Sequence, residues 1–383
     1  MMARLGDICI SITDGSHNPP PGVEKSNFLM ISSKNIDDDS ITLDAPRYLS
    51  AEDFEAENRR TNIMPNDLLM TIVGTIGRVA VVTDRINKIC VQRSVAVIKP
   101  DITVVNPRFL MYQIQGKRDI LEKESHGVAQ KGLYLKQVEQ IEIWVPTICE
   151  QLAIVNQLDK VSDLIALRKR QIEKMDELVK ARFVEMFGDL SSNPFGWQFK
   201  LLSDVCDVRD GTHDSPEYVD SGFPLLTSKN FTNGFVDFSE VNLISKKDFD
   251  AINQRSKVDV GDIVMPMIGT IGHPVIIDTD RLFAIKNVAL IKFANSPVSN
   301  IFVREILNSD YFRNVVDEKN RGNTQKFIAL GDIRKIRIPI VGSDLQKQFA
   351  IFTNQVNQSK AIVRQGLDKL ETLKSALMQE YFG

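Results

Sequence analysis

The chain has 383 residues, a length that predicts two or three domains at about 150 residues each. Apolar residues make up 43% of the sequence and charged residues 25%, which is typical of a globular protein and excludes a disordered chain. The net charge is only −3, so a surface that attracts nucleic acid or a membrane must be local. The four cysteines form no CxxC pair, and no segment has the roughly 18 apolar residues of a membrane span. We therefore expect a cytoplasmic protein without a disulfide framework, a zinc site or a membrane segment.

An internal repeat organises the sequence. Three pairs of motifs recur at an offset of 195 residues: Ser33-Lys34-Asn35 and Ser228-Lys229-Asn230, Gly74-Thr75-Ile76-Gly77 and Gly269-Thr270-Ile271-Gly272, and Gln130-Lys131 and Gln325-Lys326. A fourth pair, Asp14-Gly15-Ser16-His17 and Asp210-Gly211-Thr212-His213, recurs at an offset of 196. Ordered matches at nearly one offset predict a tandem duplication of a unit of about 190 residues, far longer than a solenoid repeat.

The first part of each repeat, 1–146 and 191–341, predicts a mixed α/β globule. Short apolar runs such as 68–73, broken by Gly, Pro, Asn and Asp, indicate strands with turns between them. The segments 109–124 and 302–316 have helical patterns. We therefore expect two tandem globules of the same mixed architecture.

The second part of each repeat, 147–190 and 342–383, predicts one long helix. A capping box opens each helix: Thr147-Ile148-Cys149-Glu150 and Ser343-Asp344-Leu345-Gln346. Apolar side chains then follow alternating steps of four and three residues, a heptad seam that includes Leu158, Ile165, Ile172, Val179, Val356, Val363, Leu370 and Leu377, and also Ser359 and Leu373. A helix of 40 residues is about 60 Å long, too long for one globule to cover. We expect the two helices to pair antiparallel as a coiled-coil spacer in an α+β protein, with Gly188 as the C-cap of the first helix.

Enzyme signatures are incomplete in this sequence. The two Gly-Thr-Ile-Gly turns lack the lysine and the span of a phosphate-binding loop. Asn18-Pro19-Pro20-Pro21 is similar to the Asn-Pro-Pro-aromatic motif of adenine methyltransferases, but proline replaces the aromatic residue, and a surface loop is the better interpretation. The histidines show neither HxH nor HExxH spacing. These observations favour a binding protein without catalytic or metal-ligating residues.

Basic residues concentrate in matching segments of the two halves. The segment 313–337 has seven Lys or Arg against three acids, and 108–136 has six against three. A charged helix face in water is the alternative interpretation for one such run. Its recurrence in both halves favours contact with the phosphates of nucleic acid.

Each helix also ends in Phe-Gly, at Phe187-Gly188 and Phe382-Gly383. The four motif pairs, the alternation of globule and heptad helix, and these endings together resemble the target-recognition domains of type I restriction–modification specificity subunits. The resemblance covers essentially the whole chain. It implies a non-catalytic subunit that reads double-stranded DNA, each globule recognising one half of a bipartite asymmetric site. It also implies two methyltransferase (modification) subunits docked by the helices, and restriction subunits bound through them. S-adenosylmethionine, Mg²⁺ and ATP would be held by those partners and none by this chain.

Residues that both halves share cannot distinguish two different half-sites, so we assign them to turn geometry and phosphate positioning. Divergent polar residues beside them, such as Arg78 and its counterpart His273, are candidates for reading bases. The candidate DNA-binding residues are Lys34, Asn35, Arg78, Arg93, Gln130, Lys131, Lys229, Asn230, His273, Lys286, Gln325 and Lys326. The candidate partner-binding helix positions are Leu158, Ile165, Ile172, Val179, Val356, Val363, Leu370 and Leu377.

Two other functions stay open at this point. The chain could be a self-contained DNA methyltransferase or nuclease with a divergent active site, which methyl transfer by the chain alone would reveal. It could also be a coiled-coil scaffold whose globules bind protein, which loss of salt-sensitive DNA binding would favour.

Overall fold

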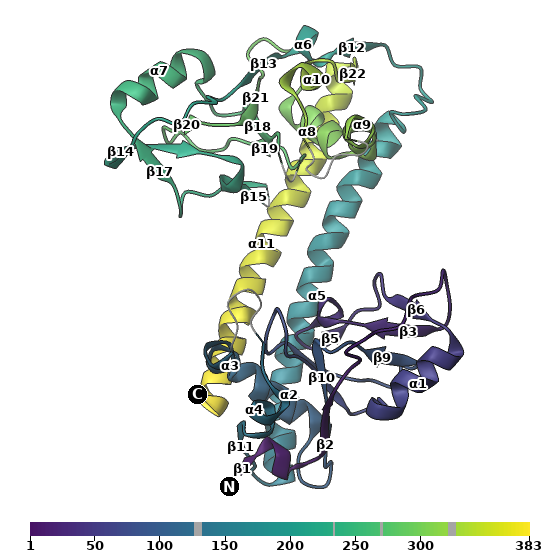
Figure 1. The fold of residues 1–383 in the computed structure, drawn as a ribbon. Helices are drawn as coiled ribbons and strands as arrows, with labels where there is room; N and C mark the ends of the chain where they lie inside the picture. The colour runs from purple at the N-terminus through teal and green to yellow at the C-terminus, as the bar shows by residue number, and fades with distance from the viewer. Residues whose placement is uncertain (126–131, 233, 269–270, 321–326) are drawn as a thin grey trace. The chain divides into compact units, whose positions relative to one another are not determined.

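The computed structural model describes residues 1–125, 132–232, 234–268, 271–320 and 327–383. The chain divides into two compact units (Figure 1): unit 1 comprises Met1–Arg168 with Gly366–Gly383, and unit 2 comprises Lys169–Gln365. Within the described residues, no helix combines the length and the apolar character needed to cross a membrane. We call the α/β part of unit 1 globule 1 (β1 to β11) and that of unit 2 globule 2 (β12 to β22).

The centre of globule 1 is an antiparallel sheet with the order β2-β10-β7-β8. Its strands are β2 (Cys9–Asp14), β10 (Val95–Pro100), β7 (Leu68–Thr71) and β8 (Val79–Val81). Alternate residues of a strand face opposite sides of a sheet. Leu68 and Met70 accordingly join a core with α2 (Pro107–Gly116), whereas Leu69 joins a second core on the other face. Burial on both faces explains why the strands are continuous apolar runs in the sequence.

The second core of globule 1 lies under a three-stranded sheet with the order β6-β3-β9. This sheet is built from β6 (Arg47–Leu49), β3 (Phe28–Ile31) and β9 (Ile89–Val91), and it carries α1 (Ala51–Thr61). The remaining elements are β1 (Met2–Arg4) paired with β11 (Glu142–Trp144), β4 (Ile36–Asp37) paired with β5 (Ser40–Ile41), and the short helices η1 (Leu5–Asp7), η2 (Ser33–Asn35), α3 (Arg118–Glu124) and α4 (Leu135–Glu139).

Globule 2 repeats this architecture. Its central sheet has the order β13 (Asp207–Asp210), β21 (Val288–Lys292), β18 (Ile263–Pro266) and β19 (Val275–Ile276). The second sheet is β17 (Asn242–Ile244), β14 (Tyr218–Leu226) and β20 (Ala284–Ile285), and the small pairs are β12 (Phe199–Leu201) with β22 (Arg337–Pro339) and β15 (Phe231–Thr232) with β16 (Phe235–Val236). The helices are α6 (Leu202–Val205), η3 (Ser228–Asn230), α7 (Lys246–Ser256), α8 (Asn300–Asn308), α9 (Asp310–Lys319) and α10 (Leu330–Arg334). The predicted duplication of a mixed α/β globule is confirmed.

Two predicted helices are each divided in two. The segment 109–124 is interrupted at Lys117, between α2 and α3, and the segment 302–316 is interrupted at Ser309, between α8 and α9. The reason at Ser309 is local capping, since its hydroxyl accepts the N–H of Phe312 and starts a new helix.

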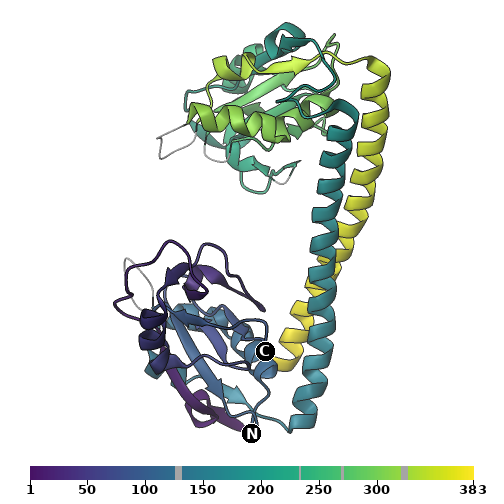
Figure 2. The same ribbon diagram turned by 90° about the vertical axis from the view of Figure 1, so that its right-hand side faces the viewer.

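The two long helices are α5 (Ile148–Phe187) and α11 (Ser343–Phe382), each 40 residues as the heptad pattern predicts. Within each unit, Figure 2 shows segments of the two helices side by side and running in opposite directions. In unit 1 the Tyr381 hydroxyl donates to the side chain of Gln157 at 2.8 Å, and in unit 2 Lys360 pairs with Asp176. The antiparallel pairing is therefore present within each unit.

The predicted seam holds along α5 and fails at two positions of α11. Leu158, Val179 and Val363 are buried in it, whereas Ile165, Ile172, Val356, Leu370 and Leu377 are half-buried. Ser359 and Leu373 were expected in the seam but are exposed, Leu373 to 46%. A straight helix drifts relative to a strict heptad. Beyond Leu373, the C-terminal end of α11 packs on globule 1 through Phe382, whose ring lies 5.5 Å from that of Phe109.

The capping box predicted at the start of α5 is present, whereas the one predicted at the start of α11 is not. Thr147 and Glu150 form the capping box, with the Glu150 N–H donating to the Thr147 hydroxyl at 3.3 Å and the Thr147 N–H donating to the Glu150 carboxylate at 2.9 Å. Ser343 is already the first residue of α11, and the Gln346 side chain accepts the Ser299 N–H and donates to the Val341 carbonyl. Gly188 follows α5 with φ +78°, the left-handed conformation of a C-cap glycine, as predicted.

Candidate nucleic-acid interface

The shared motifs meet at one end of each central sheet, which we call the loop end. Because neighbouring strands are antiparallel, the end of one strand lies beside the start of the next. In globule 1 this places Asp14–His17, Gln92–Ser94 and Gly74–Arg78 together. In globule 2 the loop end contains Asp210–His213 and the turn that precedes β21.

The glycine of the Asp-Gly-Ser/Thr-His motif allows two backbones to touch at the loop end. The Ser16 N–H donates to the Val91 carbonyl at 2.9 Å, and a Cβ atom at Gly15 would lie only 1.9 Å from that oxygen. In globule 2 a Cβ atom at Gly211 would lie 2.4 Å from the Ile285 carbonyl oxygen. Only glycine fits this approach, so the motif fixes the position of the following turn.

A buried carboxylate in the same motif orients two basic side chains. In globule 1 the Asp14 carboxylate contacts His17 Nε2 at 2.7 Å and pairs with Arg60, and only 11% of its side chain is exposed. His17 and Arg60 are more than half exposed, so they present donors to solvent from fixed positions. Donors held in this way suit contact with an anion such as a phosphate.

Globule 2 contains the same triad of Asp210, His213 and Arg255. Asp210 contacts His213 Nε2 at 2.8 Å and pairs with Arg255. His213 Nδ1 also bonds Asn287 Oδ1 at 2.9 Å. The hydrogen bond to Asn287, followed by the one to Asp210, raises the pKa of His213 above its ordinary value. The sequence analysis named the Asp-Gly-Ser/Thr-His motif but missed Arg60 and Arg255, although both are arginine at the repeat offset of 195.

The asparagines of the Ser-Lys-Asn motifs have a structural role. Asn35 is buried, and its side chain accepts the Ser32 N–H at 3.1 Å and donates to the Asp44 carbonyl at 2.9 Å. Asn230 is equally buried and accepts the Thr227 N–H at 2.9 Å. The contact of Asn35 and Asn230 with DNA stays a prediction, and their amides are used inside the fold. The assignment of this motif to turn geometry is correct for both.

The glycines of the Gly-Thr-Ile-Gly turn are required by the backbone. Gly74 and Gly77 have φ of +87° and +79°, and Gly272 has φ of +94°. Arg78, which follows this turn, forms an ion pair with Asp37 at 3.3 Å and stays 38% exposed. Its counterpart His273 is exposed. The divergent pair therefore occupies corresponding positions at the two loop ends.

Four of the other candidate DNA-binding residues lie within the described part of the chain. Lys34, Lys229 and Arg93 are exposed, and Lys286 is half-buried with its ammonium group donating to the Ser215 hydroxyl. Their role in DNA binding stays a prediction. Gln130, Lys131, Gln325 and Lys326 lie outside the described residues.

Several cations of the two basic segments are used inside the units. Arg108 donates to Asp159 at 2.8 Å, and Arg118 pairs with Asp38. Arg334 donates twice to the Val208 carbonyl. These arginines hold elements of the fold together, which reduces the local positive charge that composition alone indicates.

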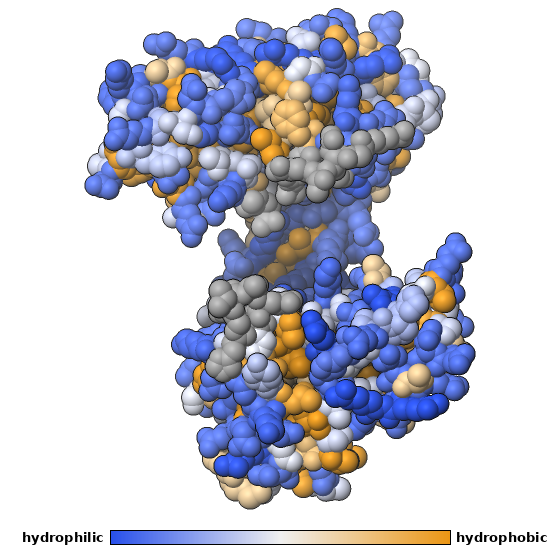
Figure 3. All heavy atoms as spheres, viewed as in Figure 1, coloured by the Kyte–Doolittle hydropathy of each residue, from blue (hydrophilic) through white to orange (hydrophobic). Residues whose placement is uncertain are grey.

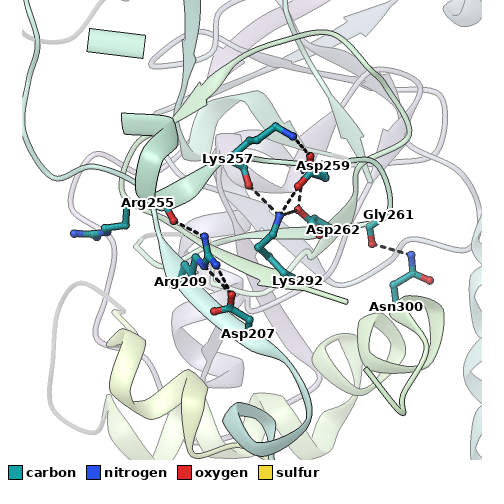
Figure 4. Close-up of polar contacts among 9 residues, drawn as sticks. All are labelled: Asp207, Arg209, Arg255, Lys257, Asp259, Gly261, Asp262, Lys292 and Asn300. Atoms are coloured by element: carbon teal, nitrogen blue, oxygen red, sulfur yellow. Dashed lines mark hydrogen bonds and ion pairs between the residues drawn. The ribbon is translucent and has the colours of Figure 1, made fainter. Parts of the chain in front are cut away.

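Lysine and arginine side chains also hold the loops around β21. Figure 4 shows the Lys292 ammonium group between Asp259 and Asp262, at 2.9 and 2.6 Å from their carboxylates. Arg209 pairs with Asp207 and donates to the Arg255 carbonyl at 2.9 Å. An open cavity of about 700 Å³ beside the triad is lined by Arg209, Asp210, Gln254, Arg255, Leu330 and Arg334. Of its three arginines, Arg209 and Arg255 are paired with aspartates and Arg334 donates to a backbone carbonyl.

The long helices also have exposed apolar side chains outside the seam. Leu164, Leu167, Leu178 and Ile362 are between 45% and 71% exposed. On the face shown in Figure 3, hydrophilic residues otherwise dominate the surface of each globule. Partner docking on the helices stays a prediction, and a partner would meet these exposed side chains before the seam. Within the described part of the chain, no three His, Cys, Asp or Glu side chains gather as a metal site.

Two copies of one α/β globule, each with the same loop-end frame and different side chains on it, define a two-domain recognition protein. The family model described as type I restriction modification DNA specificity domain matches residues 21–177 and 194–372. The chain belongs to this family and contains its domain twice, which confirms the resemblance found in the sequence. Specificity subunits of this family are generally non-catalytic and assemble with other subunits and DNA.

Individual proteins agree with this assignment. The specificity subunit of the type I restriction enzyme MjaVIII from Methanocaldococcus jannaschii is 22% identical over 296 residues, which are 72% of this chain and 69% of that protein. The EcoBI specificity subunit of Escherichia coli is 30% identical over 156 residues, or 40% of this chain and 31% of that protein. Among solved structures, a type I S subunit from M. genitalium covers 100% of this chain and 96% of its own, with a TM-score of 0.57 at 14% identity. A chain from a structure on the assembly and conformational transition of a type I system has a TM-score of 0.52 at 16% identity, covering 100% and 97%.

Proposed function

We propose that this chain selects the DNA sequence on which a type I restriction–modification complex acts. Each globule reads one half of a bipartite asymmetric site through its loop end. The observation that carries this proposal is the pair of loop ends, in which the frame is the same and side chains at matched positions, such as Arg78 and His273, differ. A protein that reads two different half-sites with duplicated domains needs this combination.

We further propose that the helices α5 and α11 set the distance between the half-sites and dock two methyltransferase subunits. Restriction subunits would join through these. S-adenosylmethionine, Mg²⁺ and ATP would be bound by those partners, and the chain itself would carry no catalytic activity. The complex would work in the cytoplasm. The incomplete enzyme motifs of the sequence support this division of labour.

The test uses the full chain assembled with its methyltransferase partner in a host that lacks other DNA methylation. Sequencing the methylated bases should give a bipartite asymmetric site. Exchange of residues 191–341 for those of a relative should then change one half of the site and preserve the other. A change in both halves would show that the globules do not read independently. Methyl transfer by the isolated chain would instead support the self-contained enzyme.

A further inference from the structure

The turn that leads into the second strand of the central sheet differs between the globules, although its position is the same. In globule 1 this turn contains Gln92 and Arg93 before β10, and we call it reading turn 1. In globule 2 it contains Lys286 and Asn287 before β21, and we call it reading turn 2. Building on the proposed function, we propose that the side chains of these turns read bases in the half-site bound by their own globule.

The frame of both turns is made by backbone atoms. Reading turn 1 donates one backbone N–H to the Ile31 carbonyl at 3.0 Å and the next to the Ser16 carbonyl at 2.9 Å. Reading turn 2 donates the same two N–H groups to Leu226 at 2.9 Å and to Thr212 at 3.1 Å. The two turns therefore present their side chains from equivalent places. Because backbone atoms hold the turns, the side chains can differ without loss of the frame.

The side chains that differ are of the types that distinguish bases. Arginine and lysine bind guanine through its O6 and N7 atoms, and asparagine and glutamine bind adenine through N6 and N7. Arg93 is exposed, and its backbone N–H donates to the Ser16 carbonyl. In reading turn 2 the ring of His213 bonds the Asn287 amide oxygen at 2.9 Å, which fixes the orientation of the amide. We expect Arg93 to read guanine and Asn287 to read adenine.

The shared neighbours of the reading turns have the complementary role. His17 and Arg60 in globule 1, and His213 and Arg255 in globule 2, are positioned by equivalent aspartates. Identical residues cannot separate two half-sites, so His17, Arg60 and Arg255 suit contact with the DNA backbone, which is the same for every sequence. Both ring nitrogens of His213 are bonded inside the loop end, to Asp210 and Asn287, so His213 holds its neighbours in position. Each loop end thus combines a constant contact that sets the register with a variable turn that reads bases.

The experiment uses the full chain assembled with its partners, after its target has been identified by sequencing methylated bases. The Kd of Arg93→Asn is measured for the target and for every single-base variant of it. We expect discrimination to fall by about 5- to 150-fold at one base pair of one half-site. The matched control is Arg85→Asn, since Arg85 is also exposed but follows β8 at the opposite end of the sheet. Its discrimination should equal that of the wild type.

The second variant, Asn287→Gly, should relax one base pair of the other half-site, and glycine tolerates the φ of +55° at this position. A uniform weakening of Arg93→Asn for all variants of the target would make Arg93 a phosphate contact and overturn the proposal. Unchanged discrimination in both variants would also overturn it. Failure of the proposed function has a different signature, because the wild-type complex would then methylate no defined bipartite sequence.

Discussion

Gln346 is buried in the first turn of α11 and ties this helix to globule 2. Its Oε1 atom accepts the Ser299 N–H at 2.8 Å, and its Nε2 atom donates to the carbonyls of Val341 at 2.8 Å and Pro297 at 3.3 Å. The substitution Gln346→Leu keeps the size of the side chain and removes all three bonds. A buried polar group left without a partner costs about 1–3 kcal/mol. The two bonds of 2.8 Å, to Ser299 and Val341, dominate this cost, and the buried leucine side chain offsets a small part of it. We therefore expect the free energy of unfolding of unit 2 to fall by about 3 kcal/mol.

Thermal unfolding followed by circular dichroism measures this loss. For a domain the size of unit 2, each kcal/mol lowers Tm by about 2–4 °C, so the expected fall is about 6–12 °C. The matched control is Gln348→Leu, an exposed position in the same turn, which should change stability by no more than about 0.5 kcal/mol. Gln151 makes the same three kinds of bond in unit 1, with Asn106, Val104 and Pro146, and Gln151→Leu should destabilise that unit in parallel. Equal Tm values for Gln346→Leu and Gln348→Leu would refute the reasoning.

Three further predictions concern assembly, DNA affinity and pH. Ile172→Pro removes a helix hydrogen bond in the middle of α5 at a cost of about 3 kcal/mol or more, so co-purification with the methyltransferase partner should be lost while circular dichroism still shows folded globules. Lys229→Ala removes an exposed cation that both copies share, so salt titrations should show equal weakening for all DNA sequences and a slope smaller by about one. Hydrogen bonds to Asn287 and Asp210 raise the pKa of His213 in the folded protein. The protonated ring therefore stabilises the fold fully below the unfolded-state pKa of about 6.5, and this stabilisation is lost as the pH rises through the folded-state pKa. An NMR titration should find that pKa above 6.5, and lower in Asn287→Gly.

The elements with strong periodicity could be predicted from the sequence. The heptad pattern located α5 and α11 to within about three residues of their ends, since a long helix repeats its signal many times. The repeat offset revealed two globules of one architecture before any strand was assigned. The capping box expected at the start of α11 does not form: Ser343 and Gln346 have its spacing, but the Gln346 side chain is buried and bonds Ser299 and Val341. The recurrence of glutamine at 151 and 346 was the available signal for their shared role.

Polar residues were harder to assign because their partners are distant in the sequence. Asn35 looked like a DNA contact, but its amide bonds a carbonyl nine residues away in the folded turn. Arg108 belongs to a basic segment, yet its partner Asp159 lies on α5, 51 residues further along the chain. Arg60 was missed because Asp14, which orients it, is 46 residues before it. Whether a polar side chain can contact DNA depends on its burial and on its hydrogen-bond partners in the fold. The neighbouring residues in the sequence indicate neither.

The two loop ends suggest why one architecture can serve many half-sites. The sheet beneath each loop end has both faces buried, so its stability depends on apolar side chains that the reading turns do not supply. The turns themselves are held by backbone bonds and by a glycine that lets the chains touch, and these contacts are indifferent to the side chains that follow. Reading turn 2 is one residue shorter than reading turn 1, because Ser94 has no counterpart before Val288. The parallel β-bridge between Ser16 and Gln92 nevertheless has an equivalent between Thr212 and Lys286. Substitutions in a reading turn can therefore alter recognition at little cost in stability, whereas substitutions at Gly15 or Gly211 would displace the turn itself.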